Sequence, residues 1–174
     1  MTEKTPHNMP ASIRQRLLNL SKSRGQEFDL TRLNYAIERL MARLEATAHN
    51  GEFVLKGAQL LKLWMDLPHR ATRDLDLLRT GRSDLEFLVS IFRALADAND
   101  PAADGISFDP LTTKGAVIRE DGLYQGVRVT IQFSIGGKPD TLQVDVGVGD
   151  VMEPRPVALE MPSSLGFPPV RVLA

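Results

Sequence analysis

Two aspartates stand two residues apart in the stretch RDLDLL. Its alternation of polar and apolar residues predicts a β-strand in which Asp74 and Asp76 leave one face while Leu75 and Leu77 face the core. Magnesium commonly takes one or two such carboxylates together with phosphate oxygens and water. Asp-x-Asp also occurs by chance, which leaves two solvent-facing side chains as the alternative. Because Asp is disfavoured inside strands, the pair favours a metal site.

Cations and a glycine turn near this strand would suit a polyphosphate. Arg70 and Arg73 precede the aspartates, and guanidinium groups bind phosphate oxygens in a fork. Upstream, EFVLKGAQLLKLW predicts a short buried strand over 53–55 that breaks at Gly57 into a helix. A glycine at such a junction lets backbone N–H groups approach a phosphate. A simple turn is the alternative interpretation of this glycine.

A third aspartate lies in a later predicted strand. Alternating residues over 127–135 and 142–148, with a Gly- and Pro-containing turn between them, predict a β-hairpin. Because successive side chains of a strand point to opposite faces, Asp145 is expected on the polar face that also displays Arg128, Thr130 and Gln132. Asp145 therefore either pairs with Arg128 across the sheet or joins the two other aspartates around a metal. Three carboxylates on one face repel one another unless a cation is bound, which favours the metal.

Helices precede these strands. An amphipathic pattern predicts a helix that begins with a capping box at Ser12 and ends at Gly25, and a second helix from about Asp29 to Leu44. The charged side chains of the second helix are expected to face solvent; they are Arg32, Glu38, Arg39, Arg43 and Glu45. A second capping box at Ser83 predicts a later packing helix. Two short strands are predicted over 106–108 and 116–118.

Composition limits the function classes. The chain of 174 residues is 43% hydrophobic and 25% charged, which is typical of one globular domain. A formal net charge of −1 provides no global attraction to nucleic acid or to an acidic membrane. Absence of cysteine excludes disulfides and thiolate metal sites. Neither a signal peptide nor a run of about 18 apolar residues is present, so a cytoplasmic location is expected.

The segments FVLKGAQLLKLW, HRATRDLDLL and LQVDVGVGD, in this order and separation, resemble the AbiEii/AbiGii toxin family of nucleotidyltransferases from bacterial abortive-infection and toxin–antitoxin loci. LTRLNYAIERLMARLE and LYQGVRV fit as well, so the resemblance covers nearly the whole chain. It implies an α+β fold with a polymerase-β-like nucleotidyltransferase core. This core has a mixed, largely antiparallel sheet, helices packed on one side and an N-terminal helical pair.

The resemblance also implies a division of the chain and roles for its residues. We expect a helical segment over 1–50, a catalytic core over 51–152 and a Pro-rich extended tail over 153–174 that is a truncation point, since family members continue into a helical half. The catalytic and metal-binding carboxylates would be Asp74, Asp76 and Asp145. The implied nucleotide- and phosphate-binding residues are Lys56, Gly57, Ala58, Arg70, Thr72 and Arg73. Ala58 departs from the Gly or Ser usual at its position.

The implied reaction is magnesium-dependent transfer of NMP from an NTP to an RNA, with tRNA as the expected acceptor, by the toxin component of such a system. A cognate antitoxin would be a protein partner. Between Lys56 and Arg82, six Lys or Arg against three Asp predict a basic RNA-facing patch, with a solvated surface as the alternative. The alternative function is a truncated, non-catalytic remnant that keeps nucleotide or antitoxin binding. A glycosyltransferase-type Asp-x-Asp is disfavoured because it needs a larger parallel framework.

Overall fold

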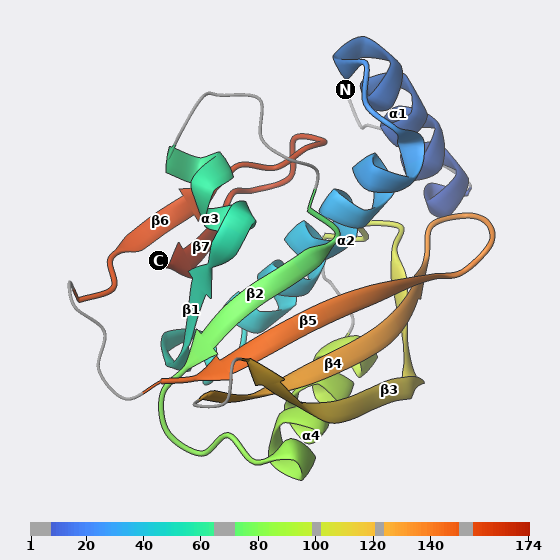
Figure 1. The fold of residues 1–174 in the computed structure, drawn as a ribbon. Helices are drawn as coiled ribbons and strands as arrows, with labels where there is room; N and C mark the ends of the chain where they lie inside the picture. The colour runs from blue at the N-terminus through green and yellow to red at the C-terminus, as the bar shows by residue number, and fades with distance from the viewer. Residues whose placement is uncertain (1–7, 65–71, 99–101, 121–123, 150–154) are drawn as a thin grey trace.

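The computed structural model describes residues 8–64, 72–98, 102–120, 124–149 and 155–174 (Figure 1). The strands are β1 (Phe53–Lys56), β2 (Asp74–Arg79), β3 (Ser107–Glu120), β4 (Tyr124–Ser134), β5 (Asp140–Val148), β6 (Ala158–Met161) and β7 (Val170–Leu173). They form one seven-stranded sheet in the order β3-β4-β5-β2-β1-β7-β6. Within it, β2 and β5 are parallel, as are β1 and β7, whereas the other neighbours are antiparallel. The predicted mixed, largely antiparallel sheet is confirmed.

The α-helices of the described residues are α1 (Met9–Arg24), α2 (Phe28–Glu45), α3 (Gly57–Trp64) and α4 (Leu85–Asp97). Helices α2 and α4 cover one face of the sheet (Figure 1), where α2 contacts β5 and β7 and α4 contacts β3 and β4, and α1 packs against α2. This arrangement confirms the α+β class and the N-terminal helical pair. In the part of the chain that the structure describes, no helix is long and apolar enough to cross a membrane.

The alternation in β2 and in the predicted hairpin decides which side chains enter the core. Leu75 and Leu77 are fully buried under the helices, whereas Asp74 and Asp76 are half-buried on the other face. The hairpin forms as β4 and β5, whose inward residues are buried in the same apolar cluster as the two leucines. One sheet face is therefore apolar and covered, and the polar residues of β2, β4 and β5 share the opposite face.

The starts of α1 and α4 differ from the predicted capping boxes. Asn8 and Asp84 cap these helices, each accepting a hydrogen bond from the backbone N–H three residues later, at 3.2 and 3.0 Å. The boxes predicted at Ser12 and Ser83 are therefore wrong, because a better-placed acceptor lies nearby in both cases. The predicted end of α1 at Gly25 is confirmed, since this residue has a left-handed φ of 60°.

The two short strands predicted over 106–108 and 116–118 are parts of the single strand β3. Its register against β4 shifts between Asp109 and Lys114. This irregularity accommodates Pro110, which cannot donate to the ladder. The prediction of two strands separated at the proline was therefore wrong, because a β-bulge lets one strand continue past it.

Three charged residues of α2 are buried, against the expectation that they face solvent. Glu38, Arg39 and Arg43 are each less than 10% exposed. Arg39 Nε donates to Asp104 Oδ2 at 3.0 Å, and Arg43 Nη1 donates to the same oxygen at 2.9 Å. The Tyr35 hydroxyl donates to the Asp104 backbone carbonyl at 2.7 Å, and burial, followed by the Asp104 charge, raises the pKa of Tyr35. This carboxylate is distant in sequence, so helical periodicity does not reveal it.

The C-terminal segment contributes to the core. Strand β7 runs parallel to β1, with Val54 opposite Leu173, and β6 pairs with β7 at the edge of the sheet. Val170 and Val172 are 1% and 2% exposed. Two strands thus arise within the segment expected to be an extended tail. They were not predicted from the sequence, because four-residue strands between prolines show little alternation.

Candidate active site

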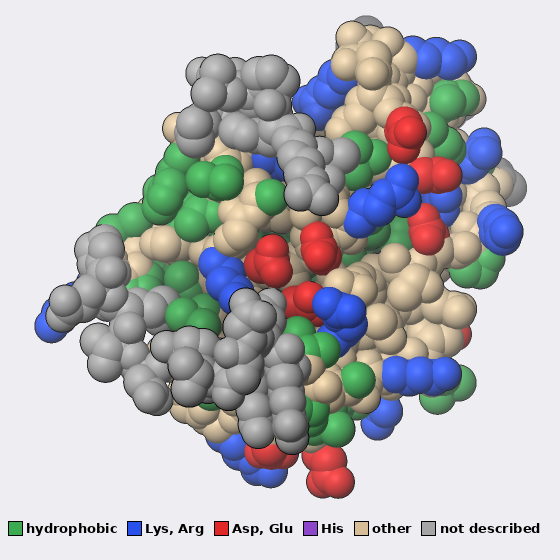
Figure 2. All heavy atoms as spheres, viewed as in Figure 1, with side chains coloured by type: hydrophobic (Ala, Val, Ile, Leu, Met, Phe, Trp, Pro, Cys, Tyr) green, Lys and Arg blue, Asp and Glu red, His purple; other side chains and the backbone are tan. Residues whose placement is uncertain are grey.

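A row of four charged residues crosses four neighbouring strands on the face opposite α2 and α4. The strand register places Lys56 of β1 opposite Asp76 of β2, Asp76 opposite Asp145 of β5, and Asp145 opposite Arg128 of β4. We call these four residues the charge row. Acidic side chains gather near the centre of this face with basic ones on both sides (Figure 2). Asp74 lies on the same face, two residues before Asp76 on β2.

Arg128 and Asp145 form a two-pronged ion pair. Arg128 Nε donates to Asp145 Oδ1 at 2.8 Å, and Nη2 donates to Oδ2, also at 2.8 Å. The Asp145 side chain is 11% exposed and that of Arg128 is 41% exposed. Hydrogen bonding to Asp145 raises the pKa of Arg128, and the charges of Asp145, Asp74 and Asp76 add to the rise. The cross-strand pairing left open by the sequence is therefore confirmed.

Thr72 orients Asp74. The buried Thr72 hydroxyl donates to Asp74 Oδ1 at 2.7 Å. This contact leaves the second carboxylate oxygen of Asp74 without a bond to that hydroxyl and fixes the direction of the side chain at the start of β2. Thr72, for which the family resemblance implied a nucleotide-binding role, thus supports one of the aspartates.

Gly57 brings the start of α3 against the charge row. This exposed residue has a φ of +69°, and a methyl group added to it would overlap Asp76 Oδ2 and lie 2.9 Å from Asp76 Cγ. Only glycine combines this backbone conformation with so close an approach. The turn at Gly57 and the next residue, Ala58, therefore open α3 beside a carboxylate of the row.

Replacing Gly57 by alanine is expected to lower the free energy of unfolding by about 3 kcal/mol, because left-handed strain adds to the overlap with Asp76. Gly25→Ala is the matched control, since Gly25 has a φ of +60° and nothing within 4 Å of an added methyl group. This control should lose only about 1 kcal/mol. Urea unfolding of both variants measures the difference. Equal losses of unfolding free energy in the two variants would show that the close approach of Gly57 to Asp76 does not affect stability.

The basic residues expected to contact phosphate have different surroundings. The Lys56 amine reaches across β2, because a methyl group added to Gly147 of β5 would lie 3.1 Å from Lys56 Nζ. Arg73 is exposed at the start of β2, where Nη2 lies 3.4 Å from Glu27 Oε2. Arg70 lies outside the described residues. The structure thus brings Lys56 to the row and leaves Arg73 at its edge.

The basic patch predicted between Lys56 and Arg82 does not include Arg79. The Arg79 side chain is 3% exposed, pairs with Glu52 at 2.6 Å, and lies over the rings of Phe53 and Phe87. Its contribution to an RNA-facing surface was wrongly predicted, because the parity of β2 turns this residue away from the aspartates.

A cavity of about 260 Å³ lies between α2, α3 and the segment after β6. Lys62 of α3 lines it and donates to Asn34 at 3.1 Å and to Gln59 at 3.3 Å. Burial lowers the pKa of Lys62. The cavity was not predicted from the sequence, because its walls come from three segments that are far apart in the chain.

The oxygen ligands of Asp74 and Asp76 fit magnesium, which accepts two protein carboxylates when a nucleotide supplies further oxygens. Asp145 is less suited to be a third ligand in this arrangement, because Arg128 donates a hydrogen bond to each of its oxygens and places a positive charge beside them. Across the described ranges, no group of three or more His, Cys, Asp or Glu side chains is placed to hold a metal ion. The aspartates also have basic neighbours in the row, so their repulsion alone does not demand a metal.

The chain matches a known protein family over most of its length. The family model described as "Nucleotidyl transferase AbiEii toxin, Type IV TA system" matches residues 39–174, a range that includes the entire charge row. Among solved structures, the crystal structure of JHP933 from Helicobacter pylori is similar, with 14% sequence identity and a TM-score of 0.47. The match covers 84% of this chain and 52% of that one, so the present chain spans about half the length of JHP933. No curated protein matches the sequence.

Proposed function

Because the chain belongs to the AbiEii family of nucleotidyl transferase toxins of type IV toxin–antitoxin systems, we propose that it transfers a nucleoside monophosphate from an NTP to RNA, with tRNA as the acceptor class. The charge row is the observation that carries this proposal. It combines carboxylates that suit a metal ion with cations that suit a triphosphate, as phosphoryl transfer requires. A cognate antitoxin is the proposed protein partner.

The proposed nucleotide site lies over β1, β2 and the start of α3. Asp74 and Asp76 would hold magnesium, which, when bound, neutralises triphosphate charge and makes the α-phosphorus more electrophilic. Lys56 would contact a phosphate oxygen, and backbone N–H groups at the Gly57 turn would donate to another. Arg73, with Arg70, would stabilise the departing pyrophosphate.

In the proposed reaction, the acceptor hydroxyl oxygen attacks the α-phosphorus of the NTP and forms a new phosphodiester bond. The bond from the α-phosphorus to the bridging oxygen of the β-phosphate breaks, and pyrophosphate leaves with that electron pair. Asp145 would take the proton of the attacking hydroxyl on a carboxylate oxygen. This role is favoured when one Asp145 oxygen is released from Arg128, because that oxygen can then accept the hydrogen bond of the hydroxyl group in its place.

Incubation with each α-³²P-labelled NTP, magnesium and total tRNA tests the proposal. We expect label on RNA from one or more of the four nucleotides, because only the α-phosphate is retained in the product. The labelling should stop when EDTA removes magnesium. Failure of all four nucleotides to label RNA, with a folded protein and added magnesium, would contradict the proposed transfer to tRNA.

Binding without turnover is the second candidate function. The bidentate pairing of Asp145 with Arg128 favours it, because this carboxylate is engaged within the protein. A binding-only protein should melt at a higher temperature with magnesium and an NTP, since ligands that bind the native state stabilise it, and yet leave RNA unlabelled. Labelled RNA would exclude this alternative.

A further inference from the structure

Asp145 is already paired with the Arg128 guanidinium, so a metal ion that binds Asp145 meets a cation that is already there. The two Asp145 oxygens receive separate hydrogen bonds from one guanidinium at 2.8 Å. Charge-assisted fork pairs of this kind are stronger than neutral hydrogen bonds and are directionally specific. Each oxygen keeps a second lone pair, but the guanidinium charge beside it repels a divalent cation, so Arg128 and a metal ion compete for Asp145.

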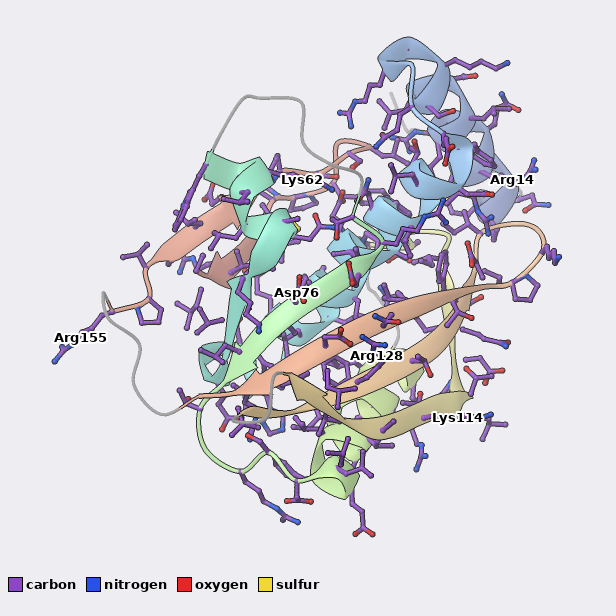
Figure 3. The ribbon with its side chains drawn as sticks, viewed as in Figure 1. Arg14, Lys62, Asp76, Lys114, Arg128 and Arg155 are labelled. Atoms are coloured by element: carbon purple, nitrogen blue, oxygen red, sulfur yellow. The ribbon has the colours of Figure 1, made fainter. Side chains whose placement is uncertain are left out.

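Of the two residues in this ion pair, Arg128 is the one whose side chain can change position. Its side chain is 41% exposed, whereas the Asp145 side chain is 11% exposed and lies within the row between Asp76 and Arg128. Asp76 and Arg128 project from β2 and β4 toward the same face of the sheet (Figure 3). An arginine on this side can leave the carboxylate and remain above the row, whereas Asp145 cannot turn away without leaving the sheet face.

A nucleoside triphosphate offers Arg128 a replacement partner. Guanidinium groups bind phosphate oxygens with the same fork that they use for carboxylates. Exchange of Arg128 from Asp145 to a phosphate would free a carboxylate oxygen where the metal and the acceptor hydroxyl need one. The three aspartates could then hold the metal together, whereas the described part of the chain now contains no group of three such side chains placed to hold one.

We propose that Arg128 is a positioning residue that withholds Asp145 from divalent cations until a triphosphate takes its guanidinium. This inference rests on the proposed nucleotidyl transfer and adds that the triphosphate binds Arg128 before Asp145 binds a metal ion. Magnesium alone binds weakly, at Asp74 and Asp76, and magnesium and nucleotide each strengthen the binding of the other. The coupling is reciprocal, because linkage requires the same factor in both directions.

Isothermal titration of the full chain with magnesium chloride alone tests the competition. Arg128→Gln removes the competing charge while keeping a polar side chain, so we expect magnesium affinity to rise by about tenfold or more, within the usual range of coupling between sites. The rise should vanish in the Arg128→Gln/Asp145→Asn double variant, because the gain depends on the Asp145 carboxylate. Unchanged or weaker magnesium binding in Arg128→Gln would overturn the proposal.

The matched control is Arg155→Gln. Arg155 is exposed and projects away from the charge row (Figure 3), so its loss should leave magnesium affinity unchanged. An equal gain in this control would show a general charge effect and contradict competition at Asp145. Circular dichroism melting checks that the variants fold. Should Arg128→Gln not fold, Arg128→Lys keeps the charge without the fork, and its magnesium affinity must exceed that of the unmodified chain.

A second titration separates this inference from the proposed function. Magnesium is added in the presence of each non-transferable α,β-methylene NTP analogue in turn. The unmodified chain should bind magnesium more tightly with at least one analogue, and Arg128→Gln should show a smaller further gain. If both of these binding results are obtained but RNA is not labelled, the transfer reaction is contradicted and the role of Arg128 is not. Equal coupling in the unmodified and Arg128→Gln chains would contradict the role of Arg128 alone.

Discussion

Replacement of Asp76 by alanine is expected to lower the rate of nucleotide transfer by about 10³-fold, equivalent to about 4 kcal/mol of transition-state stabilisation. Asp76 stands at the centre of the charge row, opposite both Lys56 and Asp145, and contacts the turn at Gly57. Its loss removes one of two carboxylates that would hold magnesium and leaves Asp74 alone on β2. Initial rates of incorporation from an α-labelled NTP at saturating magnesium measure the effect.

Asp97→Asn provides the control for a lost aspartate charge. Asp97 is exposed at the end of α4, outside the row, and its replacement should leave the transfer rate within about twofold, as is usual for surface changes. A melting temperature for each variant excludes unfolding as the cause of a lower rate. Undiminished transfer in folded Asp76→Ala would refute the metal-binding role proposed for this residue.

Replacement of Asp104 by asparagine is expected to lower the free energy of unfolding by about 3 to 5 kcal/mol, the usual cost of breaking a buried ion pair from one side. Asp104 is 3% exposed and accepts hydrogen bonds from Arg39 and Arg43, which are themselves buried. Asparagine keeps the size of the side chain and removes its charge. Both guanidinium groups then lose the carboxylate that they share inside the protein. Urea unfolding followed by circular dichroism measures this loss.

The same Asp97→Asn variant is the control for stability, because it removes an aspartate charge from the surface. Its free energy of unfolding should change by less than about 0.5 kcal/mol. Glu38→Gln/Arg39→Met/Arg43→Met/Asp104→Leu removes all the buried charges of this group, including Glu38, whose Oε1 lies 3.9 Å from Arg39 Nη1. It should recover much of the stability lost in Asp104→Asn, since neutral replacement of a complete buried ion cluster costs little. A loss below about 1 kcal/mol in Asp104→Asn would mean that water, rather than the carboxylate, compensates the two arginines.

Local alternation in the sequence was sufficient to predict the two faces of the sheet. A strand turns successive side chains to opposite sides, so the leucines of β2 required Asp74 and Asp76 to share the other face. The same rule placed Asp145 on the polar side of β5. The family resemblance, carried by three short segments around these residues, is confirmed by the family model over residues 39–174. The metal and nucleotide roles of these residues stay predictions.

The alternation of side chains along a strand does not decide which residues of different strands are neighbours. Asp76 lies opposite Asp145 because β2 and β5 are adjacent and parallel, although long segments separate them in the chain. The choice between a metal and Arg128 as the partner of Asp145 was open for the same reason. It depended on the register of β4 against β5, which places Arg128 directly opposite Asp145. Two strands from the C-terminal segment complete the sheet beside β1 in a similar way.

Neighbouring residues in the chain were enough to predict the helix and strand types of the long periodic segments, the polar face of the sheet and the family. These features follow from side-chain direction and apolar periodicity, which depend on residues close together in the chain. The partners of charged residues became known from the packed fold, including the burial of Arg39 and Arg43 around Asp104 and the ion pair of Asp145 with Arg128. An ion pair depends on the distance between two groups in space, and the packing of the whole sheet against α2 and α4 sets that distance.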